Sequence, residues 1–79
     1  MGASGERIKA TFNLTPQDVE RLKYLAREQG ITHTEALRRA IATEHFIYTT
    51  VREGSKVLVE SPKGDVRELI LHYRLPAPA

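Results

Sequence analysis

Residues 7–14 alternate strictly between polar and apolar side chains. A period of two is typical of a β-strand that buries one face. The apolar positions are Ile8, Ala10, Phe12 and Leu14, and the polar positions are Arg7, Lys9, Thr11 and Asn13. The pattern therefore predicts a strand near the N-terminus, with its polar side chains on the exposed face.

Apolar residues at helical spacing follow, and their flanking residues predict two helices. Thr15-Pro16 is typical of a helix start, and Gly30 is typical of the position just after a helix end. Thr32-His33-Thr34-Glu35 is a capping box, which predicts that a second helix begins at once. This helix is expected to cover roughly residues 33–53 and to end at Gly54.

The C-terminal part contains two β-type runs, at residues 56–60 and 66–72. Ser61-Pro62-Lys63-Gly64-Asp65 lies between them and has the proline and glycine of a turn, so the two runs predict a hairpin. The small and polar residues 1–5 predict a flexible N-terminus, and residues 74–79 predict a flexible tail. The expected order is strand, helix, helix, hairpin.

The size of the chain changes this picture, because 79 residues form at most one small domain. Such domains usually need disulfides, a metal or a partner subunit. The chain has no cysteine, and its three histidines lack the spacing of metal ligands, so we expect no metal site. A partner subunit remains as the expected support. The absence of an apolar membrane span and of a signal peptide predicts no membrane partner and a cytoplasmic location.

The predicted N-terminal strand also needs a neighbour for its backbone groups. It can pair with the C-terminal hairpin of the same chain, or with the same strand of a second chain across a two-fold axis. The second solution explains more, because it supplies the partner subunit and gathers Lys9, Thr11 and Asn13 of both chains on one ribbon. A two-stranded ribbon fits the major groove of DNA.

Over residues 6–50 the chain resembles the ribbon-helix-helix DNA-binding family, which includes Arc, MetJ and CopG. The likeness lies in the segments Lys9–Pro16, Leu22, Leu25–Ala26, Gly30–Leu37 and Ala40–Ile41. The resemblance implies a mainly α fold with short β-structure: a ribbon-helix-helix intertwined homodimer with a two-stranded intermolecular antiparallel ribbon. We expect this domain over residues 6–54 and the hairpin extension over residues 55–73.

The family resemblance also implies the residues of the DNA site. Base contacts are expected from Lys9, Thr11 and Asn13, and phosphate contacts from Thr32, His33 and Thr34. Independently of the resemblance, the charge of Arg7 predicts a further phosphate contact, with a solvated side chain as the alternative. Lysine can donate to guanine, asparagine pairs with adenine, and threonine offers a hydroxyl and a methyl group. The amides at a helix N-terminus hold anions. The dimer core is expected to contain Ile8, Phe12, Leu14, Leu22, Leu37 and Ile41.

These expectations describe a homodimeric, sequence-specific DNA-binding protein, a transcriptional regulator or repressor with no cofactor and no enzyme activity. Its partners are double-stranded DNA and itself, with higher-order assembly on DNA. The net charge of +2 permits a nucleic-acid partner without demanding one. The alternative is an antitoxin or another interaction module whose residues 55–73 bind a protein partner.

Overall fold

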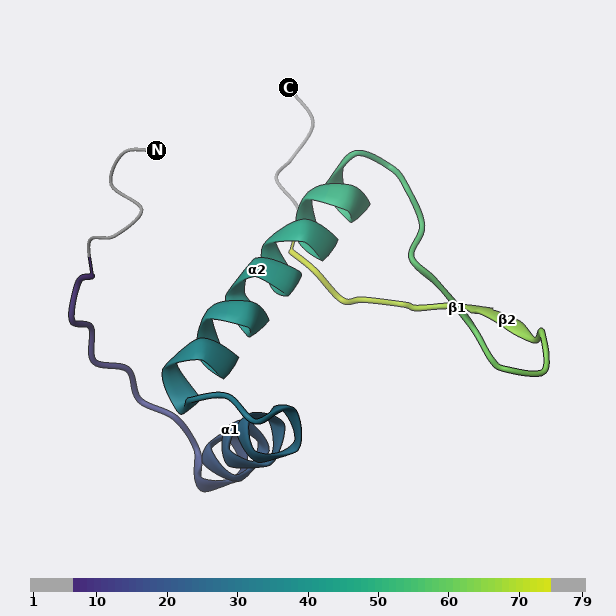
Figure 1. Cartoon of the computed structure of the whole chain (residues 1–79). Helices are drawn as coiled ribbons and strands as arrows, with labels where there is room; N and C mark the ends of the chain where they lie inside the picture. The colour runs from purple at the N-terminus through teal and green to yellow at the C-terminus, as the bar shows by residue number, and fades with distance from the viewer. Residues whose placement is uncertain (1–6, 75–79) are drawn as a thin grey trace.

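The computed structural model describes residues 7–74 and contains two helices followed by two short strands (Figure 1). The helices are α1 (Pro16–Gln29) and α2 (His33–Arg52), and the strands are β1 (Leu58–Glu60) and β2 (Val66–Glu68). Apart from Arg74, the termini predicted to be flexible (residues 1–5 and 74–79) lie outside the described residues. No helix within residues 7–74 is long and apolar enough to cross a lipid bilayer.

Both helices begin at the predicted threonine caps. The Thr15 hydroxyl accepts from the Asp18 amide at 3.1 Å, and the Thr32 hydroxyl accepts from the Glu35 amide at 3.0 Å. At the end of α1, Gly30 adopts the left-handed conformation with φ of 66°, which lets the chain turn directly into α2. These local signals confirm the predicted starts of both helices and the predicted end of the first.

The two helices meet through small residues. Ala26 of α1 and Ala36 of α2 are 2% and 3% exposed, and they are the buried apolar residues among those described. A side-chain hydrogen bond of 2.8 Å from Arg39 to Gln29 joins the same two helices. The helix pair therefore has a close contact but a very small core of its own.

The two strands form the predicted hairpin, in which Leu58 faces Glu68 and Glu60 faces Val66. The Ser61 amide donates to the Asp65 carbonyl at 2.8 Å and closes the turn. After β2 the chain returns to α2 (Figure 1). There the Tyr73 hydroxyl donates to the Glu44 carboxylate at 2.9 Å. The hairpin tip projects away from the helices. The chain after β2, residues 69–74, is called the return segment, and its Tyr73 contacts α2.

The predicted strand over residues 7–14 does not form. These residues are extended, but they make no backbone hydrogen bond to any other segment within residues 7–74. The order of elements is therefore helix, helix, strand, strand, and the predicted ribbon-helix-helix fold class, with its intertwined homodimer and intermolecular ribbon, is wrong. The physical reason is that alternation of side chains identifies a potential buried face but supplies no partner strand, and the hairpin lies beyond α2 (Figure 1).

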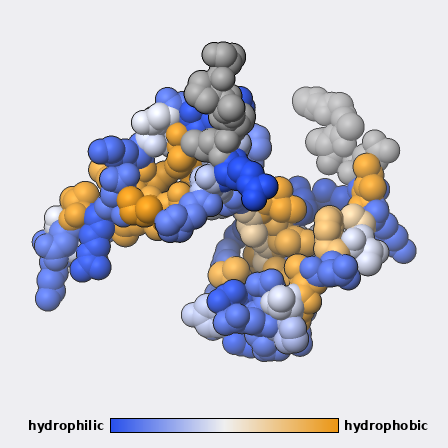
Figure 2. Space-filling model, turned by 180° about the vertical axis from the view of Figure 1, so that it is seen from behind, coloured by the Kyte–Doolittle hydropathy of each residue, from blue (hydrophilic) through white to orange (hydrophobic). Residues whose placement is uncertain are grey.

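The single chain leaves much of its apolar surface uncovered. Its accessible surface is 7423 Å². A compact monomer of 8.9 kDa exposes about 4,800 Å². On the face that Figure 2 presents, hydrophobic patches lie exposed between hydrophilic regions. The excess of roughly 2,600 Å² means that the single chain is far less compact than a globular monomer of its mass.

Candidate nucleic-acid interface

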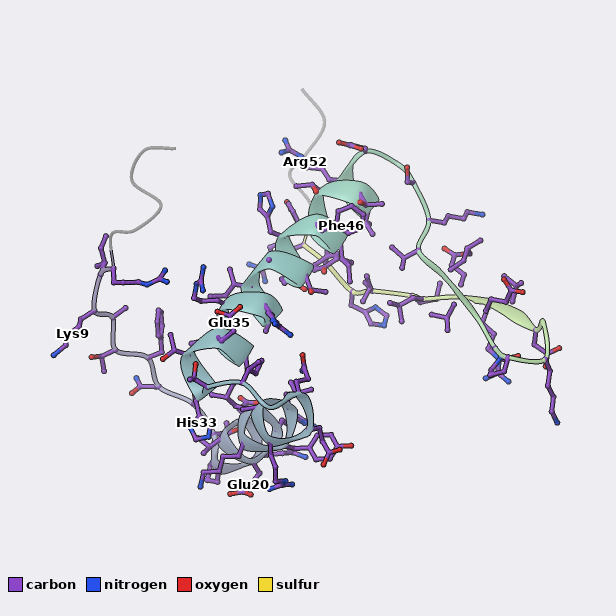
Figure 3. All side chains as sticks on the ribbon, viewed as in Figure 1. Lys9, Glu20, His33, Glu35, Phe46 and Arg52 are labelled. Atoms are coloured by element: carbon purple, nitrogen blue, oxygen red, sulfur yellow. The ribbon has the colours of Figure 1, made fainter. Side chains whose placement is uncertain are left out.

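The first part of the candidate site is the extended segment that leads into α1. The side chains of Arg7, Lys9, Thr11 and Asn13 are all exposed. In Figure 3, Lys9 points away from both helices. Because no strand forms here, the sheet face that was expected to align the three base-reading residues is absent. The structure places them along one extended stretch of chain, with their polar groups accessible from outside.

The second part is the N-terminus of α2, where Thr32, His33 and Thr34 lie together and are exposed. The first amides of a helix have no acceptor within the helix, and the helix dipole adds partial positive charge. The Thr32 hydroxyl oxygen accepts from the Glu35 amide, which leaves its own hydrogen free to donate. This end of α2 therefore has several donors that are available to one anion, and the phosphate contact of Thr32, His33 and Thr34 stays a prediction.

Glu35 brings a negative charge into the first turn of α2, but two arginines neutralise it. Arg38 and Arg39 both bind its carboxylate, with the Arg39 Nε atom at 3.4 Å. The paired arginines reduce the repulsion that the carboxylate would exert on a nearby phosphate. Both ion pairs lie on the exposed surface of α2, so they contribute little to the free energy of unfolding.

The basic residues of α1 are also engaged within their own helix. Arg21 pairs with Asp18 at 3.3 Å, and Lys23 pairs with Glu20 at 3.7 Å. The guanidinium of the third basic residue of α1, Arg27, lies 5.9 Å from the centre of the Tyr24 ring. These three cations are therefore less available to an external anion.

The extended segment differs from α1 in this respect. Arg7 and Lys9 have no ion-pair partner within residues 7–74. Both side chains are exposed. The segment thus carries cations that are free to meet an external anion.

The residues predicted for the dimer core do not form a core within one chain. The six side chains remain at least partly open to water. Ile8 is 86% exposed, Phe12 is 67% exposed, Leu14 and Ile41 are 46% and 58% exposed, and Leu22 and Leu37 are half-buried. Four of the six thus present a large apolar surface in the single chain, which leaves their assignment to a dimer contact as a prediction.

Sequence reasoning did not find the contact that holds the return segment on α2. The rings of Tyr48 and Tyr73 meet edge to face, with their centres 5.2 Å apart. Partial burial, together with the hydrogen bond to the Glu44 carboxylate and its negative charge, raises the pKa of Tyr73. The hydrogen bond joins residues 29 positions apart, so no local pattern signals it.

No protein-family model matches this chain, and comparison with curated proteins and with solved structures finds no significant similarity. The resemblance to ribbon-helix-helix proteins therefore depends on the sequence segments given above. What the chain can do must be argued from its own exposed groups.

Proposed function

We propose that this chain is a homodimeric, sequence-specific DNA-binding protein that regulates transcription. One observation carries the proposal: Arg7 and Lys9 alternate with apolar residues in an exposed segment and form no ion pair within residues 7–74. Four helix cations, in contrast, pair with carboxylates of their own helices: Arg21, Lys23, Arg38 and Arg39. An extended segment can enter a groove of DNA, where the backbone phosphates attract its cations.

Each polar residue of the site has a distinct role in this proposal. Arg7 and the α2 N-terminus hold phosphates, which fix the position of the protein but carry no sequence information. Lys9, Thr11 and Asn13 contact base edges in the major groove, where every base pair displays a different pattern of donors, acceptors and methyl groups. The charge of Lys9 also neutralises a neighbouring phosphate. Such a role would require the cytoplasmic location that we expect.

The homodimer in this proposal is supported by the uncovered apolar surface. Ile8 and Phe12 lie in the same segment as the proposed DNA contacts, and they are 86% and 67% exposed. Burying a large apolar side chain stabilises an assembly by about 1.5–3 kcal/mol. A second copy that covers these residues would therefore also hold the DNA-contacting segments of both chains in fixed positions.

A salt titration with matched lysine variants tests the proposal. The probes are a duplex from the region upstream of the chain's own gene and a duplex of the same composition in scrambled order. Lys9→Ala should weaken binding and reduce the salt slope by about one for each lost phosphate contact, or about two per dimer. The control is Lys63→Ala, which removes the same charge from the exposed turn of the hairpin and should leave the slope nearly unchanged.

Asn13→Ala tests whether the segment reads bases. We expect it to reduce the preference for the upstream duplex over the scrambled duplex by about 1–3 kcal/mol for each lost base contact. The proposal is rejected if the wild type binds both duplexes with equal affinity. It also fails if Lys9→Ala and Lys63→Ala change the salt slope equally, because the segment would then contribute only bulk charge.

A further inference from the structure

The hairpin has an open edge along β1. The Val57 carbonyl accepts from the Leu69 amide at 2.8 Å, and the Ser61 amide donates to the Asp65 carbonyl. In an antiparallel pair, the backbone groups of alternate residues point toward the partner strand. Those of Val57, Val59 and Ser61 therefore face β2. The backbone groups of the alternate positions 56, 58 and 60 must point the other way, toward solvent.

This open edge carries side chains that favour association. Leu58 and Val59 are 59% and 53% exposed, and all three residues of β1 are exposed. Natural edge strands are usually protected from pairing by a proline, a bulge or charges that repel an incoming strand. The charges here are Lys56 at one end and Glu60 at the other. This pair of opposite charges does not repel a strand of the same sequence that runs antiparallel.

Among residues 7–74, one carboxylate lies near Lys56. Its Nζ atom lies 4.0 Å from the Glu68 carboxylate, and its side chain is 71% exposed. An exposed ion pair at this distance contributes little free energy. Lys56 can therefore turn to a carboxylate on an incoming strand at little cost.

The segment Lys56-Val57-Leu58-Val59-Glu60 is complementary to itself. When two copies align antiparallel about Leu58, each Lys56 lies opposite a Glu60, and each Val57 lies opposite a Val59. The same register brings together the outward backbone groups of both strands. A shift of the two-fold axis by one residue, to Val57 or Val59, breaks both charge pairs. The sequence thus selects one register.

From this complementarity we propose that β1 pairs with β1 of a second copy of the chain and forms a four-stranded antiparallel sheet. About six backbone hydrogen bonds and two Lys56–Glu60 pairs would join the strands. The outer strand β2 is a poorer candidate. Alignment about its outward residue Glu68 places two carboxylates directly opposite one another, which is destabilising, and alignment about Val66 places the turn residue Gly64 opposite Glu68.

This contact is separate from the surface proposed to form the dimer. The hairpin and the segment that begins at residue 7 lie on opposite sides of α2 in Figure 1. One chain can therefore use both surfaces at once. Pairing of β1 strands would then join one dimer to the next, and it would not require DNA.

Cysteine cross-linking in the full chain tests the register. The natural chain has no cysteine, so Leu58→Cys introduces one thiol per chain. The two Leu58 Cα atoms would lie about 5.5 Å apart, within the range that a disulfide spans. The matched control is Val66→Cys, because Val66 is 58% exposed, lies on the same face of the hairpin and belongs to the outer strand. Oxidised glutathione should cross-link Leu58→Cys at least about tenfold faster than Val66→Cys.

Charge variants provide a second test that needs no oxidation. Glu60→Lys should weaken association through the hairpin at least about fivefold, because it places a second lysine opposite Lys56. Adding Lys56→Glu to the same chain restores opposite charges and should recover most of the association, as measured by sedimentation equilibrium. Hydrogen exchange at Val59 checks that the hairpin remains folded in each variant.

Either of two cross-linking results would overturn the proposal. Cross-linking of Val66→Cys at a rate equal to or above that of Leu58→Cys would assign the contact to β2 or to random collisions. No cross-linking of either variant would mean that β1 does not pair with itself, and its edge would then be open to a strand of a different protein. Failure of the double charge variant to recover association would likewise contradict the register.

Discussion

Tyr73 is a half-buried residue whose hydroxyl links the return segment to Glu44 on α2. Partial burial and the neighbouring carboxylate raise its pKa from the ordinary value of 10.0. The folded protein therefore holds this proton more tightly than the unfolded chain does. The resulting stabilisation is fully present below pH 10.0 and is lost as the pH rises through the raised pKa.

We expect the pH dependence of Tyr73 to appear as a difference between wild type and Tyr73→Phe. Below the ordinary tyrosine pKa, wild type should be the more stable protein, since Phe keeps a ring against Tyr48 but cannot donate to Glu44. This advantage should shrink as the pH rises above about 10. Urea unfolding at a series of pH values measures it, and a constant difference would contradict the assigned hydrogen bond.

Thr32 caps α2, and we propose that it also contacts a phosphate; a matched pair of variants can separate these two roles. Thr32→Ala should cost about 1 kcal/mol of unfolding free energy, because the Glu35 amide loses its acceptor. Thr15→Ala removes the equivalent cap of α1 and should cost about the same. If the proposed phosphate contact exists, Thr32→Ala should also lower the affinity for all DNA sequences alike, as measured by fluorescence anisotropy. Equal effects of the two variants on DNA binding would leave Thr32 with the capping role alone.

At the scale of elements, the helices could be predicted because their signals are local. Each cap joins residues three positions apart, and Gly30 ends α1 by its own backbone conformation. The strand at residues 7–14 could not be decided in this way, because a strand depends on a partner far along the chain or outside it. The hairpin lies between these cases, since its turn is local and brings the two strands together.

The site shows the same division between local and distant information. The family resemblance assigned Thr32, His33 and Thr34 to the start of the second helix, and the local capping signal placed that start correctly. The sheet face expected to hold Lys9 and the other base-reading residues depended on the missing strand and was not found. The contact between the rings of residues 48 and 73 depends on the path of the returning chain, which no local pattern encodes.

Gly30 provides a test of how much the turn between the helices contributes. A Cβ atom at this position would meet no other atom within 4 Å, so the cost of Gly30→Ala comes from the left-handed backbone alone. We expect a loss of roughly 1–2 kcal/mol of unfolding free energy, measured in urea. Gly30→Asn should lose less, because asparagine tolerates this conformation better than alanine does. Equal losses would argue against a backbone origin.

At the scale of the whole molecule, the uncovered apolar surface predicts that stability depends on protein concentration. Phe12→Ala should raise the dimer dissociation constant at least about a hundredfold, because a symmetric contact loses the side chain twice. Phe46→Ala is the control, since Phe46 is 68% exposed but lies farther along α2 (Figure 3). Sedimentation equilibrium measures both constants. Similar effects of the two variants would mean that the dimer contact is not centred on residues 7–14.

The burial of two alanines between α1 and α2 has a kinetic consequence. Each contributes one methyl group, so the energy released when a single chain folds is small. If most apolar burial waits for a second chain, folding becomes a second-order reaction, and its half-time shortens as chains accumulate. At low expression, newly made chains would be degraded before they meet, whereas a modest rise in gene dosage would yield disproportionately more of the assembled protein.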